Sequence, residues 1–125
     1  MSSFVDIILP NYNKEFFLEE TVNSVLDQDY NNWKLLILDN CSTDNSKKVI
    51  QKFEKNKKIN VIYLKKNKGV SFTRNLGIRL SNSKYIAFLD SDDLWTPNKL
   101  KDQIIFFHKT NLIFKLVRCP QVIRV

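Results

Sequence analysis

Three carboxylates stand close together in the stretch "YIAFLDSDDLWTP", residues 85–97. Asp90, Asp92 and Asp93 directly follow an apolar run, and this stretch contains no lysine or arginine that could neutralise them. Like charges at this spacing repel one another, so the cluster favours a cation among its oxygens. Carboxylate oxygens are hard ligands that suit Mg²⁺ or Mn²⁺, and an ion held by one or two of them keeps positions that substrate phosphates fill. The residue types therefore predict a metal-bridged, phosphorylated ligand.

A simpler interpretation is that these aspartates only form turns. An aspartate after a strand often caps a turn or a helix, and for a single aspartate this is the favoured explanation. Three together, with Asp39 expected at the same edge of a sheet, favour ligand binding instead. The residues leave the choice between Mg²⁺ and Mn²⁺ open.

The elements that must position these carboxylates alternate along the chain. Short apolar runs predict strands at 4–10, 33–39, 60–64 and 85–90, and helical spacing of apolar residues predicts helices at about 16–29, 45–55, 69–80 and from 97 onwards. Asp44 and Thr96 are the predicted N-caps of the second and fourth helices. The alternation indicates an α/β fold, with a Rossmann-like, mostly parallel sheet and helices on both faces.

In open parallel sheets, ligands bind outside the carboxyl ends of the strands. The polar residues that follow the predicted strands should therefore converge at one edge. They are Pro10 to Asn13, Asp39 with Asn40, and Asp90 to Asp93.

Composition sets the remaining bounds. The chain has 125 residues, enough for about one domain, and 43% of them are hydrophobic. The formal charge of +7 is most simply explained by solvated lysines on helix faces and loops. It would also suit nucleic acid, an anionic membrane or phosphorylated small molecules, but no nucleic-acid-binding motif is present, so nucleic acid is not a predicted partner. Cys41 and Cys119 lack metal-ligand spacing, and no apolar run approaches the length of a membrane span. A cytoplasmic protein is expected.

Four segments together carry a resemblance to a known family. They are "ILPNYNKEFFLEETVNSVLDQDY", "WKLLILDNCSTDNS", "NKGVSFTRNLGI" and "YIAFLDSDDLWTPNKL", and they cover roughly residues 4–110. The chain resembles the N-terminal, nucleotide-sugar-binding half of a family 2 glycosyltransferase of the GT-A fold. The resemblance implies a nucleotide-sugar-binding domain at residues 1–112, a tail at 113–125 that departs from the family pattern, and a fold that is incomplete at its C-terminus.

The resemblance also implies roles on the nucleoside side of the site. Pro10 and Tyr12 match the loop that lies against the base and ribose. Asp39 matches the acidic residue that accepts a hydrogen bond from the ring N–H of uracil or thymine. Asn40 is a departure, because many members have a second aspartate there; an asparagine can still cap the following turn.

On the diphosphate side, Asp90 and Asp92 match the Asp-x-Asp motif. The resemblance implies that Asp90 faces the ribose and the metal, that Asp92 binds the metal, and that Asp93 supports them from behind. Arg74 falls in a segment that helps to hold the nucleotide-sugar, and a guanidinium suits a phosphate or an acidic partner. The alternative for Arg74 is an exposed helical arginine.

The implied activity is transfer of a sugar from a nucleoside diphosphate donor, most simply a UDP-sugar, to a hydroxyl of a saccharide or glycolipid acceptor. Metal dependence and inversion at the anomeric carbon are expected. The general base is expected in a C-terminal half beyond this chain, because Asp102 lies in a predicted helix. By family analogy the setting is bacterial polysaccharide or glycolipid assembly at the inner face of the membrane, with peripheral membrane contact as a further hypothesis.

Two other interpretations compete. The chain could be a truncated module that binds nucleoside diphosphates without transferring sugar. A phosphoacceptor signalling domain also groups acids on a parallel sheet, but it requires an acidic pair after its first strand, where this chain has Pro10, Asn11 and Tyr12. Trp33 and Trp95 are interpreted as packing residues rather than as platforms for a sugar ring.

Overall fold

The structure of the protein is a computed structural model, in which residues 4–110, 116–117 and 123–124 are described. Its main sheet has five parallel strands in the order β3-β2-β1-β4-β6. Those strands are β1 (Val5–Asn11), β2 (Trp33–Asp39), β3 (Ile59–Tyr63), β4 (Tyr85–Phe88) and β6 (Leu116–Val117). A separate antiparallel pair joins β5 (Asp93–Leu94) to β7 (Ile123–Arg124).

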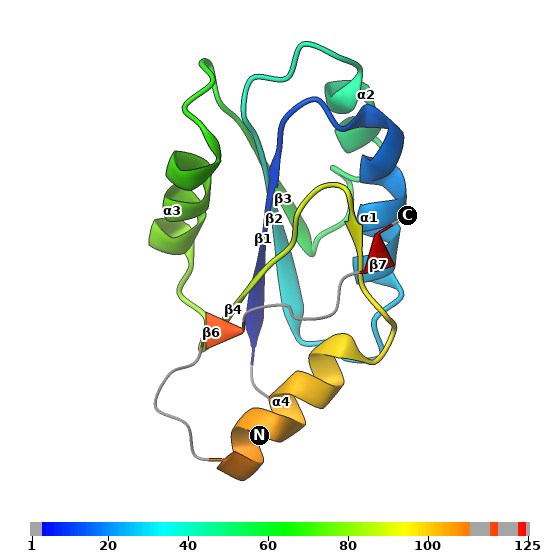
Figure 1. Ribbon diagram of the computed structural model, residues 1–125, viewed down its shortest axis with the longest axis vertical. Helices are drawn as coiled ribbons and strands as arrows, with labels where there is room; N and C mark the ends of the chain where they lie inside the picture. The colour runs from blue at the N-terminus through cyan, green and yellow to red at the C-terminus, as the bar shows by residue number, and fades with distance from the viewer. Residues whose placement is uncertain (1–3, 111–115, 118–122, 125) are drawn as a thin grey trace.

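Helices cover both faces of the main sheet (Figure 1). They are α1 (Glu15–Leu26), α2 (Ser46–Gln51), α3 (Val70–Leu80) and α4 (Lys99–Thr110). In Figure 1, α3 lies alone on one face, α1 and α2 lie on the other, and α4 crosses the end where the strands begin. The predicted α/β class and mostly parallel sheet are confirmed.

The core explains why the middle of each central strand is apolar, with polar residues only at the second and last positions. β1 and β2 have neighbours on both edges and helices on both faces, so Ile7, Ile8, Leu35 and Ile37 are all fully buried. In the main core, Ile7, Leu35 and Ile37 pack with Leu18, Val22 and Val25 of α1, whereas Ile8 lies on the opposite face, against α3. Trp33 and Trp95 are 3% and 4% exposed, so both are packing residues as predicted.

Gly77 allows α3 to lie directly on the sheet. A Cβ atom built at this position would lie 2.6 Å from Cγ2 of Ile8 in β1, closer than real Cβ atoms approach a neighbour. The glycine that breaks the helical pattern in the sequence is therefore a packing requirement, and it fixes how near α3 comes to β1.

The prediction that Thr96 caps the fourth helix is wrong. α4 begins at Lys99, three residues later. The carbonyl of Thr96 accepts a hydrogen bond from Nε2 of Gln28 (2.7 Å), and the carbonyl of Pro97 accepts one from the backbone N–H of Asp29 (2.8 Å). These contacts with the segment just after α1 hold residues 96–98 outside the helix.

The second helix is also shorter than predicted. α2 ends at Gln51 instead of continuing to Lys55, because the following N–H groups bond to carbonyls three residues back in tight turns. Its N-cap is Asn45 rather than Asp44. Asp44 stands one residue earlier and instead links the starts of two helices, since its carboxylate accepts the backbone N–H groups of Ser46 and Glu15. Within the described ranges, no helix is long and apolar enough to cross a membrane.

Candidate functional site

The ends of the parallel strands meet at one edge, as predicted. Asn11 lies opposite Asp39 in the register of β1 and β2, and Nδ2 of Asn11 donates a hydrogen bond to Oδ1 of Asp39 at 2.9 Å. The backbone N–H of Asn40 donates to the carbonyl of Asn11 at 2.8 Å, so the two strand ends are joined twice. β4 lies on the other side of β1, and this brings the acidic loop to the same edge.

Asp39 is buried and its carboxylate is already well hydrogen-bonded. Besides Asn11, the carboxylate accepts the backbone N–H of Ser42 at 3.0 Å and the Ser42 hydroxyl at 2.7 Å. Only 4% of the residue is exposed. Neutral partners therefore fix this carboxylate in place. The sequence indicated Asp39 but missed its partners, although a serine three residues after an aspartate is a recognisable turn signal.

Asn40 connects two loops of the site instead of capping the turn that follows it. Its Nδ2 donates to Oδ1 of Asn67 at 2.8 Å, and its Oδ1 accepts the backbone N–H of Lys68 at 2.8 Å. The turn after β2 is closed by Asp39 and Ser42. Asn40 therefore ties the loop after β2 to the loop that leads into α3.

Asp90 and Asp92 have partners that the sequence analysis did not find. Nη2 of Arg74 in α3 lies 2.7 Å from Oδ1 of Asp90, and Nζ of Lys14 lies 3.5 Å from Oδ2 of Asp92. The aspartate side chains remain 48% and 39% exposed. Cations distant in sequence therefore supply counter-charges, which the absence of lysine and arginine within residues 85–97 did not reveal. Arg74 faces the acidic loop rather than open solvent.

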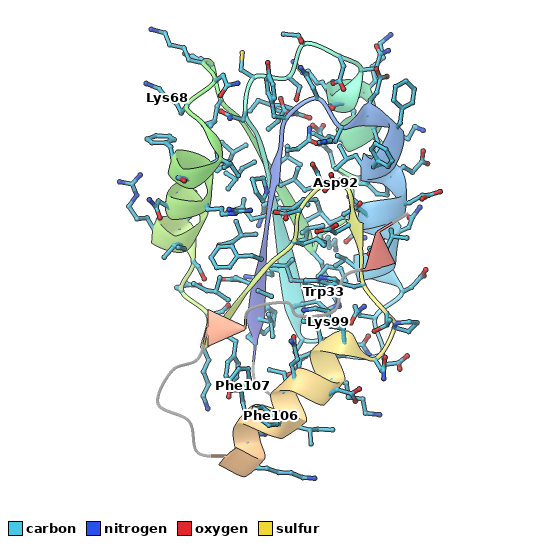
Figure 2. All side chains as sticks on the ribbon, in the orientation of Figure 1. Trp33, Lys68, Asp92, Lys99, Phe106 and Phe107 are labelled. Carbon is cyan, nitrogen blue, oxygen red and sulfur yellow. The ribbon has the colours of Figure 1, made fainter. Side chains whose placement is uncertain are left out.

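Asp93 differs from its two neighbours. It is only 5% exposed and belongs to β5, and its backbone N–H closes a turn by donating to the carbonyl of Asp90 at 3.1 Å. It is thus placed behind the exposed pair. Figure 2 shows Asp92 on the loop between the sheet and α1, and Lys68 near the start of α3.

The chemistry of these oxygens can be compared with what a divalent ion requires. Within the described residues, no three acidic, histidine or cysteine side chains are grouped closely enough to hold a metal by themselves. Mg²⁺ is typically bound through one or two carboxylates together with water and substrate phosphates. Two half-exposed carboxylates in one loop, Asp90 and Asp92, fit that mode of binding.

A shallow hollow lies beside the end of β1. It is lined by Pro10, Asn11, Tyr12, Asn40, Val70 and Thr73. Pro10 is buried in the strand, whereas Tyr12 is 42% exposed. The structure therefore brings Pro10 and Tyr12 together with the loop after β2 and the first turn of α3.

One ionisable group at this edge has a shifted pKa with a clear cause. Burial raises the pKa of Asp44, but hydrogen bonds from Ser46 and from the backbone N–H of Glu15 outweigh burial and hold the pKa below its ordinary value. Asp44 is thus ionised at neutral pH and stabilises the arrangement of α1 and α2.

Comparison with known sequences gives a consistent family. The family description "Glycosyl transferase family 2" matches residues 6–123. A Bacillus subtilis glycosyltransferase named for teichuronic acid biosynthesis, TuaG, is 40% identical over 111 residues, covering 88% of this chain and 44% of TuaG. The Escherichia coli UDP-Glc:alpha-D-GlcNAc-diphosphoundecaprenol beta-1,3-glucosyltransferase WfgD is 39% identical over 110 residues, covering 88% of this chain and 43% of WfgD. The chain thus spans less than half the length of these relatives.

Solved structures agree with the sequence comparison. S. aureus TarS 1–349 in complex with UDP-GlcNAc superposes with a TM-score of 0.80 at 28% identity, over 86% of this chain and 32% of that one. A mannosyltransferase from Pyrobaculum calidifontis, in complex with GDP-Man and Mn²⁺, has the same fold at 19% identity, with a TM-score of 0.79 over 86% of this chain and 33% of the other. The chain therefore belongs to glycosyl transferase family 2, and it has the GT-A-like, Rossmann-like fold that the resemblance implied.

Proposed function

We propose that this chain binds a UDP-sugar as the donor-binding part of an enzyme that transfers the sugar to an acceptor hydroxyl. One observation carries the proposal. A buried, hydrogen-bonded aspartate at the end of β2 and two exposed, cation-paired aspartates after β4 lie at one edge of the sheet, on either side of β1. The relatives support this choice of donor, because TarS was solved with UDP and with UDP-GlcNAc, and WfgD is named for UDP-Glc.

On the nucleoside side, Asp39 accepts the ring N–H of uracil, with thymine as the alternative. A fixed carboxylate suits this role, because its position depends on Asn11 and Ser42 rather than on the ligand. Pro10 and Tyr12 line the adjacent hollow, and they lie against the base and ribose. The half-exposed phenol ring of Tyr12 offers an apolar surface for stacking.

On the diphosphate side, Asp92 and Asp90 hold Mg²⁺ or Mn²⁺. When bound, such an ion stabilises the negative charge that develops on the departing diphosphate. Arg74 lies on the same side of the site. Its planar guanidinium, which pairs with Asp90, can also bind a phosphate oxygen.

We further propose inversion by direct displacement, which needs a general base to take the proton of the acceptor hydroxyl. Asp102 is the only acidic residue after Asp93 in this sequence. It is exposed on α4 and accepts a hydrogen bond from Asn98 at 2.7 Å, outside the strand ends where the donor would lie. The base is therefore expected from residues beyond this chain. Residues 1–112 are proposed as the donor-binding domain, and residues 113–125, which include β6 and β7, as a tail whose sequence departs from the family pattern.

The placement of Asp102 also keeps a second candidate function open. The chain on its own would then be a nucleoside-diphosphate-binding module without transferase activity. Release of UDP from UDP-glucose or UDP-GlcNAc, to water or to an added acceptor, supports the first function. Metal-dependent UDP binding with no such release supports the second.

A titration tests donor binding directly. UDP, dTDP and GDP are titrated into the chain by calorimetry with and without Mn²⁺, using the parent chain, Asp92→Ala and, as a matched control carboxylate, Asp102→Ala. The expected result is tightest binding of UDP or dTDP, an Mn²⁺ effect that is lost in Asp92→Ala, and parent behaviour in Asp102→Ala. Equal Mn²⁺ effects in all three proteins would contradict the assignment.

The proposed setting is the assembly of a bacterial polysaccharide or glycolipid at the inner face of the membrane, by analogy with the relatives. WfgD is named for an acceptor on diphosphoundecaprenol, which is a lipid. Peripheral contact with an anionic membrane would follow from the charge of +7. Sedimentation with anionic liposomes that decreases as salt rises is the expected result; no sedimentation at low salt would remove this part of the proposal.

A further inference from the structure

One face of α1 holds the acidic loop from behind. Thr21, Ser24 and Gln28 lie at or just beyond the last two turns of this helix, and their side chains bond to the backbone between residues 91 and 100. We propose that these three are positioning residues, which set where Asp90 and Asp92 stand and thereby support metal-linked donor binding. This inference rests on the proposed function.

Two of these four contacts are buried and two are partly buried. The Thr21 hydroxyl, fully buried, donates to the carbonyl of Ser91 at 3.0 Å, and the Ser24 hydroxyl accepts the backbone N–H of Trp95 at 3.2 Å. The Gln28 amide, 5% exposed, donates from Nε2 to the carbonyl of Thr96 at 2.7 Å and accepts the backbone N–H of Leu100 at Oε1 at 3.1 Å.

Backbone contacts complete the attachment on both sides of the acids. The N–H of Leu89 donates to the carbonyl of Ile8 in β1 at 3.0 Å, just before Asp90. Asp90 therefore lies between two attached residues, Leu89 and Ser91. Asp92 lies in the short span between Ser91 and Trp95, so the backbone that carries the two carboxylates cannot move far without breaking one of these contacts.

Hydrogen bonds to the backbone of α1 also hold the three side chains in their own orientations. The Thr21 hydroxyl lies 3.1 Å from the carbonyl of Phe17 as well as 3.0 Å from that of Ser91, so the two carbonyls share its single proton. The Ser24 hydroxyl donates to the carbonyl of Thr21 at 2.7 Å, and Nε2 of Gln28 donates to the carbonyl of Ser24 at 3.1 Å. Side chains three and four residues apart share a face of a helix, so this row points at one neighbouring segment. The helix backbone fixes these three side chains whether or not the loop is in place. They can therefore determine where the loop lies.

The ion pairs of Asp90 and Asp92 on the open side of the loop cannot supply this positioning. The pairs with Arg74 and Lys14 involve side chains that are more than a third exposed, and exposed ion pairs contribute little. A diphosphate with its divalent ion would compete for both partners of each pair. The contacts with α1 involve neutral groups and lie away from the ligand, so they persist while the ligand binds. Mg²⁺ demands near-ideal coordination geometry. A fixed backbone behind the carboxylates should therefore raise the affinity of the site for the metal.

The test uses the whole chain with UDP and Mn²⁺ as probes. Thr21→Val keeps the shape of the side chain and removes the hydroxyl donor, and Thr21→Ser is the matched control that keeps the hydroxyl. The quantity measured is the ratio of the UDP dissociation constants without and with Mn²⁺. We expect Thr21→Val to lower this ratio about tenfold, as lost supporting contacts do at metal sites. Its metal-free UDP affinity and the ratio in Thr21→Ser should match the parent. If Thr21→Val does not fold, Ser24→Ala takes its place, because Ser24 is less buried.

A parent-like ratio in Thr21→Val overturns the inference, and so does an equal loss of metal-free and metal-linked binding, which would indicate a purely structural role. A parent chain that shows no Mn²⁺ effect at all instead overturns the proposed function. In that case amide hydrogen exchange decides whether α1 positions the loop. Faster exchange confined to residues 90–95 in Thr21→Val or Ser24→Ala supports it, whereas unchanged exchange there, or equal acceleration in 33–39, overturns it.

Discussion

Two carboxylates end parallel strands at the same edge of this sheet, yet their surroundings differ in kind. Asp39 is the last residue of β2, is 4% exposed, and accepts hydrogen bonds from an amide, a backbone N–H and a hydroxyl. Asp90 follows β4, leaves nearly half of its side chain exposed, and pairs with the guanidinium of Arg74. The first is held by neutral partners within the fold, and the second by a cation that can also bind a phosphate.

The comparison indicates which part of the site is framework and which part adapts to a ligand. Buried neutral hydrogen bonds are lost only with the local fold, whereas exposed ion pairs can change partners at little cost. A base-reading group benefits from the first arrangement, and a group that takes up an ion and a diphosphate benefits from the second. The following substitutions test this division.

Asp39→Ala should have the largest effect on stability. It would leave the Asn11 amide and the Ser42 N–H without their acceptor in a buried place, so we expect a loss of about 2–4 kcal/mol in the free energy of unfolding. Urea denaturation measures it. Asp90→Ala is the control and should change stability by less than about 0.5 kcal/mol. Equal losses of stability in the two variants would contradict the distinction between a structural Asp39 and an adaptable Asp90.

Gly77→Ala should have the next largest effect, because it moves the helix that carries Arg74. The added methyl group would collide with Ile8, and overpacking of this kind costs about 1–3 kcal/mol. Ile8→Ala removes the atoms that collide. The double variant should therefore be more stable than the sum of the two single losses predicts, as measured by thermal unfolding. Simple additivity would mean that α3 does not rest on β1 at this point.

Asp44→Ala should have a moderate effect that depends on pH. Its pKa in the folded chain lies below the ordinary 3.8, so the carboxylate contributes stability above that value, and the contribution is lost as pH falls through the folded pKa. We expect a loss of about 1 kcal/mol at pH 7, as for other helix-start contacts, and a smaller difference from the parent below pH 3.8. Urea denaturation at several pH values checks this. A loss that is constant from pH 7 to pH 3 would contradict it.

Arg74→Ala should have the smallest effect on stability. Its pair with Asp90 is part-exposed, so the free energy of unfolding should change by less than about 0.5 kcal/mol, and added salt should remove the difference. UDP binding in the presence of Mn²⁺ should nevertheless weaken. A salt-insensitive loss above about 1 kcal/mol in the free energy of unfolding would contradict this division, because it would mean that Asp90, like Asp39, is held by contacts that the fold needs.

The helices and strands could be predicted because buried apolar residues recur with the period of each element along the sequence. The strand predicted at 33–39 is β2 (Trp33–Asp39), and the helix predicted at 69–80 is α3 (Val70–Leu80) with Gly69 as its N-cap. Strand ends in a parallel sheet share an edge, so the convergence of Asn11 with Asp39 also followed from local patterns.

The remaining features depend on partners far away in the sequence. The local sequence at Thr96 is typical of a helix N-cap, but the carbonyl of Thr96 accepts a hydrogen bond from Gln28, 68 residues earlier in the chain. The counter-charge of Asp90 comes from α3, and that of Asp92 comes from the residue before α1. Local spacing does not encode which helix lies beside which loop. The nucleotide-binding roles of Pro10, Tyr12, Asp39, Arg74 and Asp90 remain predictions, as does metal binding by Asp92.

The two ion pairs at the open edge have a thermodynamic consequence. Free Mg²⁺ would meet carboxylates that Arg74 and Lys14 already neutralise, and a diphosphate alone would meet cations that are already occupied. When both arrive together, each charge in the loop simply exchanges one counterion for another. Metal and nucleotide should therefore bind with mutual, heterotropic cooperativity, each raising the affinity of the other by the same factor.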